Sequence, residues 1–310
     1  MQPIEMEPEL IADYQCVTGE NPLWHEDEGR VYWTDIPTGR LFRYNPANNR
    51  HEQFFKGGVV GGFTFQQDGS LLLFMERGGI GLWRDFRLEM LVDRIPAEAD
   101  SRFNDVSADP RGRVFCGTMS TRGSDGELTY DGKLYRLDTD GTLSVVVQGV
   151  GVSNGIGFTP DRTSMYYTDT PKREISIFDY EEVTGAISNR RTFVRVPDRD
   201  GEGAPDGMTV DAEGYVWSAR WGGSCLVRYA PNGAEVQRVH FPAKKVSSAI
   251  FGGPEYADLY VTTAGGDTKS EDGDGAGALF RLRPGVLGVP EFRSRVTIAP
   301  EAFTVLDPPS

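Results

Sequence analysis

Short runs of apolar and β-branched residues recur along the whole chain, and turns containing Asp, Gly or Pro separate them. Six segments share one order: a small or polar residue, a short apolar stretch, a turn, and then further strand-like runs. These segments begin at Glu20, Gly61, Asn104, Asn154, Asp206 and Ser248. The intervals between successive starts are 41, 43, 50, 52 and 42 residues, each of which accommodates one propeller blade. The pattern predicts an all-β fold, a single-domain six-bladed β-propeller with a central channel.

Two strand-like runs follow each repeat start, and turn residues precede them. Second strands are predicted at residues 30–35, 70–75, 113–119, 164–170, 215–220 and 258–263. Third strands are predicted at residues 40–44, 80–84, 133–137, 174–180, 225–229 and 278–283. Because turn chemistry and repeat period agree in every segment, the whole pattern is stronger evidence than any one strand.

The ends of the chain complete the predicted ring. A closed ring hides sheet edges that would otherwise pair with other chains, but its last sheet needs a strand from the other end of the chain. Residues 9–17 have a strand-like pattern and precede the first repeat. We therefore expect a flexible tail over residues 1–8, a closing strand of the last blade over residues 9–17, and a C-terminal extension over residues 286–310.

Composition supports a compact β protein. The chain has 38 Gly and 19 Pro among 310 residues, which argues against a mainly helical fold. With 38% hydrophobic residues it can build a large core, and no run approaches the roughly 18 apolar residues of a membrane span. Three widely spaced cysteines, Cys16, Cys116 and Cys225, are interpreted as small buried residues rather than as a disulfide framework or a zinc site.

The net charge limits the kinds of molecule that the protein is expected to bind. The chain carries 32 Lys and Arg against 46 Asp and Glu, a formal charge of −14, which repels nucleic-acid phosphates and anionic lipids. The acidic first ten residues lack the apolar segment of a secretory signal, so a cytoplasmic location is expected. We expect a small-molecule substrate, no nucleic acid, no membrane, and a monomer or a weak homo-oligomer.

The repeat starts are also the candidate chemistry. In a propeller, equivalent positions of the innermost strands form a ring around the channel, so Glu20, Asn104, Asn154 and Asp206 are predicted to converge. Two carboxylates held together without a basic residue among them repel each other, and a divalent cation would relieve this. Oxygen ligands favour Ca²⁺, with Mn²⁺, Mg²⁺, Zn²⁺ and Fe²⁺ as alternatives. The competing interpretation is that these residues only cap turns at strand starts.

Four segments of the sequence carry a family resemblance. They are GENPLW (19–24), RFNDVSADPRGRVFCGTM (102–119), VSNGIGFTPD (152–161) and APDGMTVDAEGYVW (204–217). They resemble the signature segments of the SMP-30/gluconolactonase/regucalcin-like family, and the similarity spans roughly residues 14–285. The resemblance implies a six-bladed propeller, one divalent metal ion in the channel, and hydrolysis of sugar lactones to the corresponding aldonic acids.

The resemblance also assigns roles to individual positions. Glu20, Asn154 and Asp206 resemble the metal ligands of the family. Asn104 resembles the asparagine that contacts the substrate, and Arg102 resembles the arginine beside the sugar. A further substrate-binding Glu of some members has no clear counterpart here.

Glu127 and Tyr130 are the nearby candidates for that missing substrate contact. In the implied reaction the metal acts as a Lewis acid on the lactone carbonyl. Asp206 is the carboxylate predicted to act as general base, with a metal-bound hydroxide as the alternative. Asn104 and Arg102 are predicted to orient the hydroxyl groups of the sugar.

The sequence is also compatible with other functions. The same site could hydrolyse organophosphates or aryl esters, and a propeller that binds a metal or a partner without catalysis needs only the blades. His25, His51 and His240 show no ligand spacing, and no GxSxG motif accompanies them, which disfavours a Ser-His-Asp hydrolase. The sequence does not choose among the lactones of gluconic, xylonic, arabinonic and similar acids.

Overall fold

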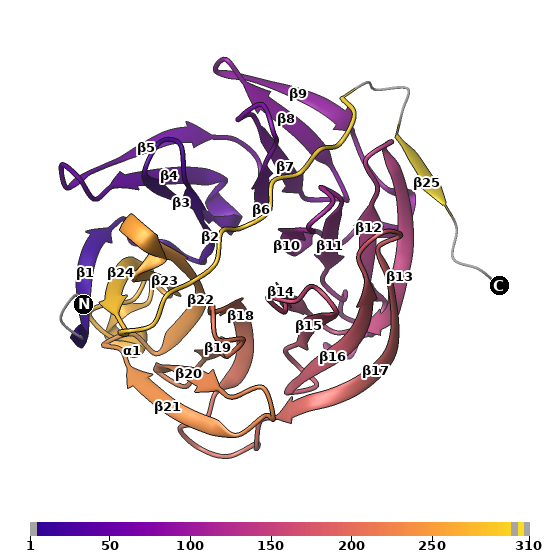
Figure 1. The fold of residues 1–310 in the computed structure, drawn as a ribbon. Coiled ribbons are helices and arrows are strands. Elements are labelled where there is room, and N and C mark those ends of the chain that lie inside the picture. The colour runs from indigo at the N-terminus through magenta and orange to yellow at the C-terminus, as the bar shows by residue number, and fades with distance from the viewer. Residues whose placement is uncertain (1–4, 299–302, 307–310) are drawn as a thin grey trace.

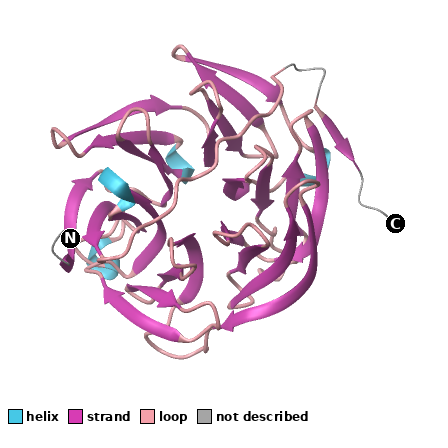
Figure 2. Ribbon diagram, viewed as in Figure 1, coloured by secondary structure: helices cyan, strands magenta, loops and turns pink. Residues whose placement is uncertain are grey.

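The computed structural model describes residues 5–298 and 303–306, and the regular secondary structure of these residues is almost entirely β-strand (Figure 2). The helical pieces within them are short and lie in connections between strands. They are η1 (Ile36–Thr38), η2 (Pro96–Glu98), η3 (Pro254–Tyr256) and α1 (Lys269–Asp272). No helix in the described part of the chain is long and apolar enough to cross a membrane.

Three sheets contain four antiparallel strands each, joined in chain order. The first consists of β2 (Gly19–His25), β3 (Arg30–Asp35), β4 (Arg40–Asn45) and β5 (Arg50–Lys56). The second consists of β6 (Val60–Phe65), β7 (Leu71–Met75), β8 (Ile80–Arg84) and β9 (Arg87–Val92). The third consists of β14 (Ser153–Phe158), β15 (Ser164–Asp169), β16 (Glu174–Glu181) and β17 (Ala186–Arg195).

A fourth sheet has five strands because the C-terminal residues add to it. Its first four strands are β10 (Phe103–Ala108), β11 (Val114–Thr118), β12 (Gly132–Leu137) and β13 (Thr142–Val150). The short strand β25 (Thr304–Leu306) pairs in parallel with the beginning of β13.

The sequence predicted six sheets, and hydrogen bonding defines five. The fifth sheet has eight strands, in two groups of four. One group is β18 (Ala204–Val210), β19 (Val216–Trp221), β20 (Cys225–Tyr229) and β21 (Glu235–His240). The other is β22 (Lys245–Gly252), β23 (Asp258–Ala264), β24 (Ala278–Arg283) and β1 (Glu5–Asp13). The groups join because the last residue of β19, Trp221, forms a bridge with the first residue of β22, Lys245.

The N-terminal strand lies earlier in the chain than predicted. β1 spans Glu5–Asp13 and pairs antiparallel with β24, with Glu9 opposite Arg281. The predicted boundaries of 9–17 for the strand and 1–8 for a flexible tail are therefore wrong where residues are described, and residues 1–4 lie outside the described part. The strand ends early because the chain turns at Gln15, whose φ is 51°, and Cys16 then donates its N–H to Gly277 O.

The six strands that begin the repeats lie innermost and contact one another in a closed cycle (Figure 1). β2 contacts β6, and the cycle continues through β10, β14, β18 and β22 back to β2. The strands approach closely at Gly61 in β6, where an added Cβ would lie 2.0 Å from Phe103 O. This contact explains why the second repeat starts with Gly and brings no polar side chain to the axis.

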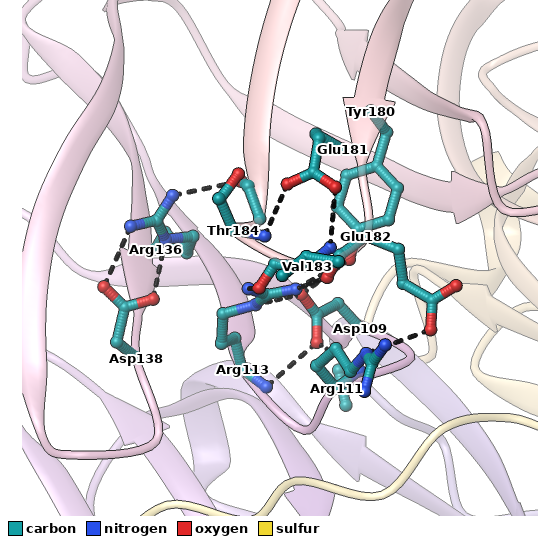
Figure 3. A network of polar contacts seen from close by, with 12 residues as sticks. Asp109, Arg111, Arg113, Arg136, Asp138, Tyr180, Glu181, Glu182, Val183 and Thr184 are labelled. Carbon is teal, nitrogen blue, oxygen red and sulfur yellow. Dashed lines mark hydrogen bonds and ion pairs between the residues drawn. The ribbon is translucent and has the colours of Figure 1, made fainter.

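Apolar side chains fill the space between neighbouring sheets. Phe74 of β7 and Phe103 of β10, for example, come from different sheets and pack edge to face with ring centroids 5.3 Å apart. Polar contacts add to this packing at the outer turns. Buried Arg113 bonds to Asp109 at 2.5 Å and also reaches the carbonyl of Val183 on the next sheet at 3.0 Å (Figure 3). These contacts fix the relative positions of the sheets that carry Asn104 and Asn154.

The C-terminal segment crosses one face of the ring (the yellow trace in Figure 1). Backbone N–H groups of this segment donate to carbonyls of several sheets: Gly288 to Tyr256, Ser294 to Phe65 and Arg295 to Gly112, each at 2.8 Å. Phe65 is the last residue of β6, so the segment lies at the end of the inner strands opposite to the repeat starts. The predicted extension over residues 286–310 thus includes a segment that covers the far end of the axis.

Candidate functional site

The four repeat starts that carry a carboxyl or amide group lie at the same end of four inner strands, and all are buried. Glu20 belongs to β2, Asn104 to β10, Asn154 to β14 and Asp206 to β18, and their exposed fractions lie between 3% and 6%. A β-bulge or similar irregularity in each of the six inner strands sets this arrangement. At this end each inner strand has one residue more than the strand beside it. Bulges of this kind redirect side chains and occur beside functional sites.

Hydrogen bonds connect two of the predicted sheets through the candidate residues. Arg102 donates from Nη1 to Asn104 Oδ1 at 2.6 Å and to Phe103 O at 2.9 Å. Asn104 then donates from Nδ2 to Asn154 Oδ1 at 2.9 Å and to Ser153 O at 2.8 Å. The structure therefore brings Arg102, Asn104 and Asn154 into one connected group.

The two carboxylates of the ring are held in an unfavourable environment. Burial raises the pKa of Glu20 well above its usual value, and the Asp206 carboxylate adds to the rise. Burial likewise raises the pKa of Asp206. Arg102 is the cation that favours their charged forms, and burial lowers its own pKa to about 10. Such a site has more negative charge than its protein surroundings neutralise.

One oxygen of this group has no hydrogen-bond partner in the part of the chain that the structure describes. Asp206 Oδ1 is buried and accepts no hydrogen bond from the described residues. Leaving a buried charged acceptor unsatisfied costs free energy, so the position calls for a cation or a water molecule. Two carboxylates and an amide oxygen suit a hard divalent cation. No cluster of three or more His, Cys, Asp or Glu with metal-binding geometry occurs in the described residues, so Asn154 has to complete the proposed set.

Sequence reasoning missed Asp105, the neighbour of Asn104. Its half-buried carboxylate acts electrostatically on both Glu20 and Asp206. Burial raises the pKa of Asp105 to about 7, against hydrogen bonds from the N–H groups of Val106 and Gly155. Adjacent residues of a regular strand point to opposite faces, and the irregularity between Phe103 and Val106 removes that constraint. The sequence shows the acidic residue but not the bulge.

Another carboxyl group, that of Glu291, interacts electrostatically with Asp105 from the far end of the axis. Glu291 lies on the C-terminal segment, and burial together with the Asp105 charge raises its pKa to about 7. It borders a cavity of about 370 Å³ that the end of β14 and Thr209 of β18 also line. The acidic groups thus extend from the repeat starts to the opposite end of the inner strands.

The structure places Glu127 and Tyr130 apart from this group. Both are exposed on the connection between β11 and β12, and Tyr130 is 40% exposed. The Tyr130 ring lies 5.5 Å from Lys172 Nζ and beside Gly151, close to the start of β14. Among the described residues, no hydrogen bond or ion pair joins Glu127 or Tyr130 to Glu20, Asn104, Asn154 or Asp206. A role in substrate binding stays a prediction for both.

The sequence has relatives that match this arrangement over nearly its whole length. The profile described as "SMP-30/Gluconolactonase/LRE-like region" matches residues 18–265, which includes all six repeat starts. The chain belongs to the SMP-30/gluconolactonase family. Within the family, Pentonolactonase XacC of Haloferax volcanii is 50% identical over 295 residues, which cover 93% of this chain and 98% of the relative.

Other members of the family extend the comparison. Regucalcin of Xenopus laevis is 32% identical over 85% of this chain and 88% of its own length. Among solved structures, the calcium-binding protein regucalcin of Agrobacterium tumefaciens superposes with a TM-score of 0.83 at 25% identity, covering 92% of this chain and 96% of that one. Membership of the family and the arrangement of inner strands therefore agree.

Proposed function

We propose that this protein is a metal-dependent sugar lactonase that opens aldonolactones, with pentonolactones as the first candidates, to the corresponding aldonic acids. The proposed metal site rests on Asp206 Oδ1, a buried oxygen beside the Glu20 carboxylate that accepts no hydrogen bond from the described residues. The proposed substrate class rests on the pentonolactonase relative, because the alignment covers 93% of this chain and 98% of the relative. Glu20, Asn154 and Asp206 are the proposed ligands of one divalent ion, with Ca²⁺ first.

The proposed scaffold is a six-bladed propeller around a central channel. The closed cycle of contacts among β2, β6, β10, β14, β18 and β22 supports six units. The eight-stranded sheet fits this count because a single bridge joins its two groups of four strands. In this scaffold the proposed ligands lie around the axis at one mouth, and the C-terminal segment crosses the other.

The reaction adds water to the lactone carbonyl carbon and breaks the bond to the ring oxygen, which leaves as a hydroxyl. A bound cation supplies Lewis acidity toward the carbonyl oxygen. Asp206 is the proposed base, which accepts a proton from the attacking water. Asp206 Oδ1 is the one carboxylate oxygen of the ring that is itself buried and lacks a partner among the described residues.

Arg102 and Asn104 are the proposed substrate contacts, and their hydrogen bonds define what each can offer. Both N–H groups of Asn104 already bond to Ser153 O and Asn154 Oδ1, so its remaining capacity is an acceptor site on Oδ1. The Nε and Nη2 groups of Arg102 bond to none of the described residues. Arg102 would therefore donate to the sugar, and Asn104 would accept from a sugar hydroxyl.

A panel of substrates tests this function. The purified protein would be supplied with Ca²⁺ or Mn²⁺ and assayed on pentonolactones, hexonolactones, an aryl ester and an aryl phosphotriester, before and after treatment with EDTA. We expect metal-dependent hydrolysis that is fastest on the aldonolactones. Faster turnover of the aryl ester or phosphotriester would assign the site to a different substrate class, and no turnover of any compound would overturn the enzymatic proposal.

A further inference from the structure

Thr170, the residue that follows β15, connects Asn154 to the neighbouring inner strand. Its hydroxyl accepts a hydrogen bond from Asn154 Nδ2 at 2.8 Å. The same hydroxyl donates to Pro205 O at 2.8 Å, and Pro205 directly precedes Asp206 in β18. Thr170 therefore joins the Asn154 side chain to the backbone beside Asp206, and among the described residues no hydrogen bond joins it to Arg102 or Asn104.

Only one assignment of donors and acceptors fits the two hydrogen bonds of the Thr170 hydroxyl. A backbone carbonyl can only accept, so the single hydrogen of the Thr170 hydroxyl points to Pro205 O. The hydroxyl must then accept from Asn154, and of the two ends of the Asn154 amide only the NH₂ group can donate. Thr170 thus holds Nδ2 of Asn154 toward itself and turns Oδ1 the other way.

The hydrogen bonds that reach Asn154 from Arg102 through Asn104 require the same orientation of the Asn154 amide. A guanidinium can only donate, so Arg102 requires the oxygen of the Asn104 amide. Asn104 then donates from its NH₂ group to Asn154, which must accept with Oδ1. A reversed Asn154 amide would set one NH₂ group against another and would place its oxygen beside the Thr170 oxygen. The orientation of Asn154 is thus fixed from both sides.

We propose that Thr170 is a positioning residue that holds the Asn154 amide oxygen in the orientation needed to bind the metal ion. The proposal rests on the proposed metal site, and it adds a residue that lies outside the predicted ligand set. Groups that orient a ligand through a hydrogen bond typically affect metal affinity by about 10- to 100-fold. Thr170 also ties the backbone before Asp206 to the sheet of Asn154, so it sets the spacing between two ligands.

The test compares Thr170→Val, which keeps the shape of the side chain but loses the hydroxyl, with Thr170→Ser, which keeps the hydroxyl. Thr159→Val is the matched control, because Thr159 donates its hydroxyl to Asp161 at the opposite end of the β14–β15 hairpin. Dissociation constants for Mn²⁺ and Ca²⁺ would be measured by calorimetry, and melting temperatures without metal would be measured for every variant.

We expect Thr170→Val to weaken metal binding by about 10- to 100-fold, with Thr170→Ser and Thr159→Val within about threefold of the wild type. Equal affinities for Thr170→Val and the wild type would overturn the proposal while leaving the metal site intact. If the wild type binds neither ion, the proposed metal site itself is wrong. Should Thr170→Val fail to fold, Thr170→Ala against Thr170→Ser provides the same comparison, because only the latter retains the hydroxyl.

Discussion

Asn104 Nδ2 donates to Asn154 Oδ1 at 2.9 Å, although the two residues are 50 positions apart and belong to different sheets. The contact joins a proposed substrate-binding residue to a proposed metal ligand. It also uses one of the two lone pairs of the Asn154 oxygen and leaves the other for a cation. Asn104 is therefore placed to link substrate binding with the metal site rather than to serve the substrate alone.

Replacing Asp206 by Ala should remove most of the metal affinity. The substitution deletes the buried carboxylate whose Oδ1 lacks a partner. We expect metal binding to weaken by at least about 100-fold, more than the loss of an orienting contact would cause. Metal analysis after dialysis measures this, and Ser248→Ala is the control because Ser248 occupies the equivalent repeat position in β22. A full complement of metal in Asp206→Ala would contradict the ligand assignment.

Asp206→Asn separates ligation from proton transfer. The variant keeps a coordinating oxygen but cannot accept the proton of the attacking water. With saturating metal we expect kcat to stay far below that of the wild type, by about 100-fold or more. Recovery of wild-type kcat under these conditions would limit Asp206 to metal binding.

Asn104→Ala should affect turnover more than metal binding. Asn104 supports Asn154 through one hydrogen bond, but it is neutral and is not a proposed ligand. We expect kcat/KM to fall by about 10- to 100-fold, the effect of losing one hydrogen bond to a polar group in a buried site. Metal affinity should remain closer to the wild type than that of Asp206→Ala, because Thr170 still holds the Asn154 amide when Asn104 is replaced. The reverse order of effects, measured by calorimetry and steady-state kinetics, would make Asn104 a ligand.

The sequence predicted the inner strands well because each begins with a recognisable repeat start. Glu20, Asn104, Asn154 and Asp206 all lie at the same end of their strands, as the repeat implies. Asp105 was missed because its orientation depends on a strand irregularity that residue types do not encode. The roles of Glu127 and Tyr130 could not be derived either, since long connections have no repeat to fix their position.

Deleting β1 should destabilise the protein strongly. Residues Glu5–Asp13 cover the edge of β24, Glu9 pairs with Arg281 at 2.6 Å, and Ala12 is buried in the core beside Tyr260. We expect removal of residues 1–13 to lower the melting temperature by about 10 °C or more, since it exposes a sheet edge and core side chains. Removal of residues 1–4 is the control and should have little effect. Similar melting temperatures for both truncations would argue against a stabilising role for β1.

Glu291→Gln should stabilise the protein in a pH-dependent way. The pKa of Glu291 is raised to about 7 in the folded state by burial and by Asp105, whereas an unfolded Glu titrates near 4.3. The wild type therefore loses stability as the pH rises from about 4 to about 7, because the folded state must give up a proton that it binds tightly. We expect Glu291→Gln to gain more stability over the wild type at pH 8 than at pH 5 in urea unfolding. An equal gain at both pH values would show that the pKa of Glu291 is not raised in the folded state.

In the proposed mechanism, a divalent ion bound by Glu20, Asn154 and Asp206 is required for opening a sugar lactone. The most direct measurement is kcat/KM for a pentonolactone, corrected for spontaneous hydrolysis, with protein stripped by EDTA and then titrated with Ca²⁺ or Mn²⁺. We expect negligible activity in the stripped wild type, recovery at one ion per chain, and no recovery in Asp206→Ala at the same concentration. Full activity of the stripped wild type, with no metal found by elemental analysis, would contradict the requirement for a bound metal ion.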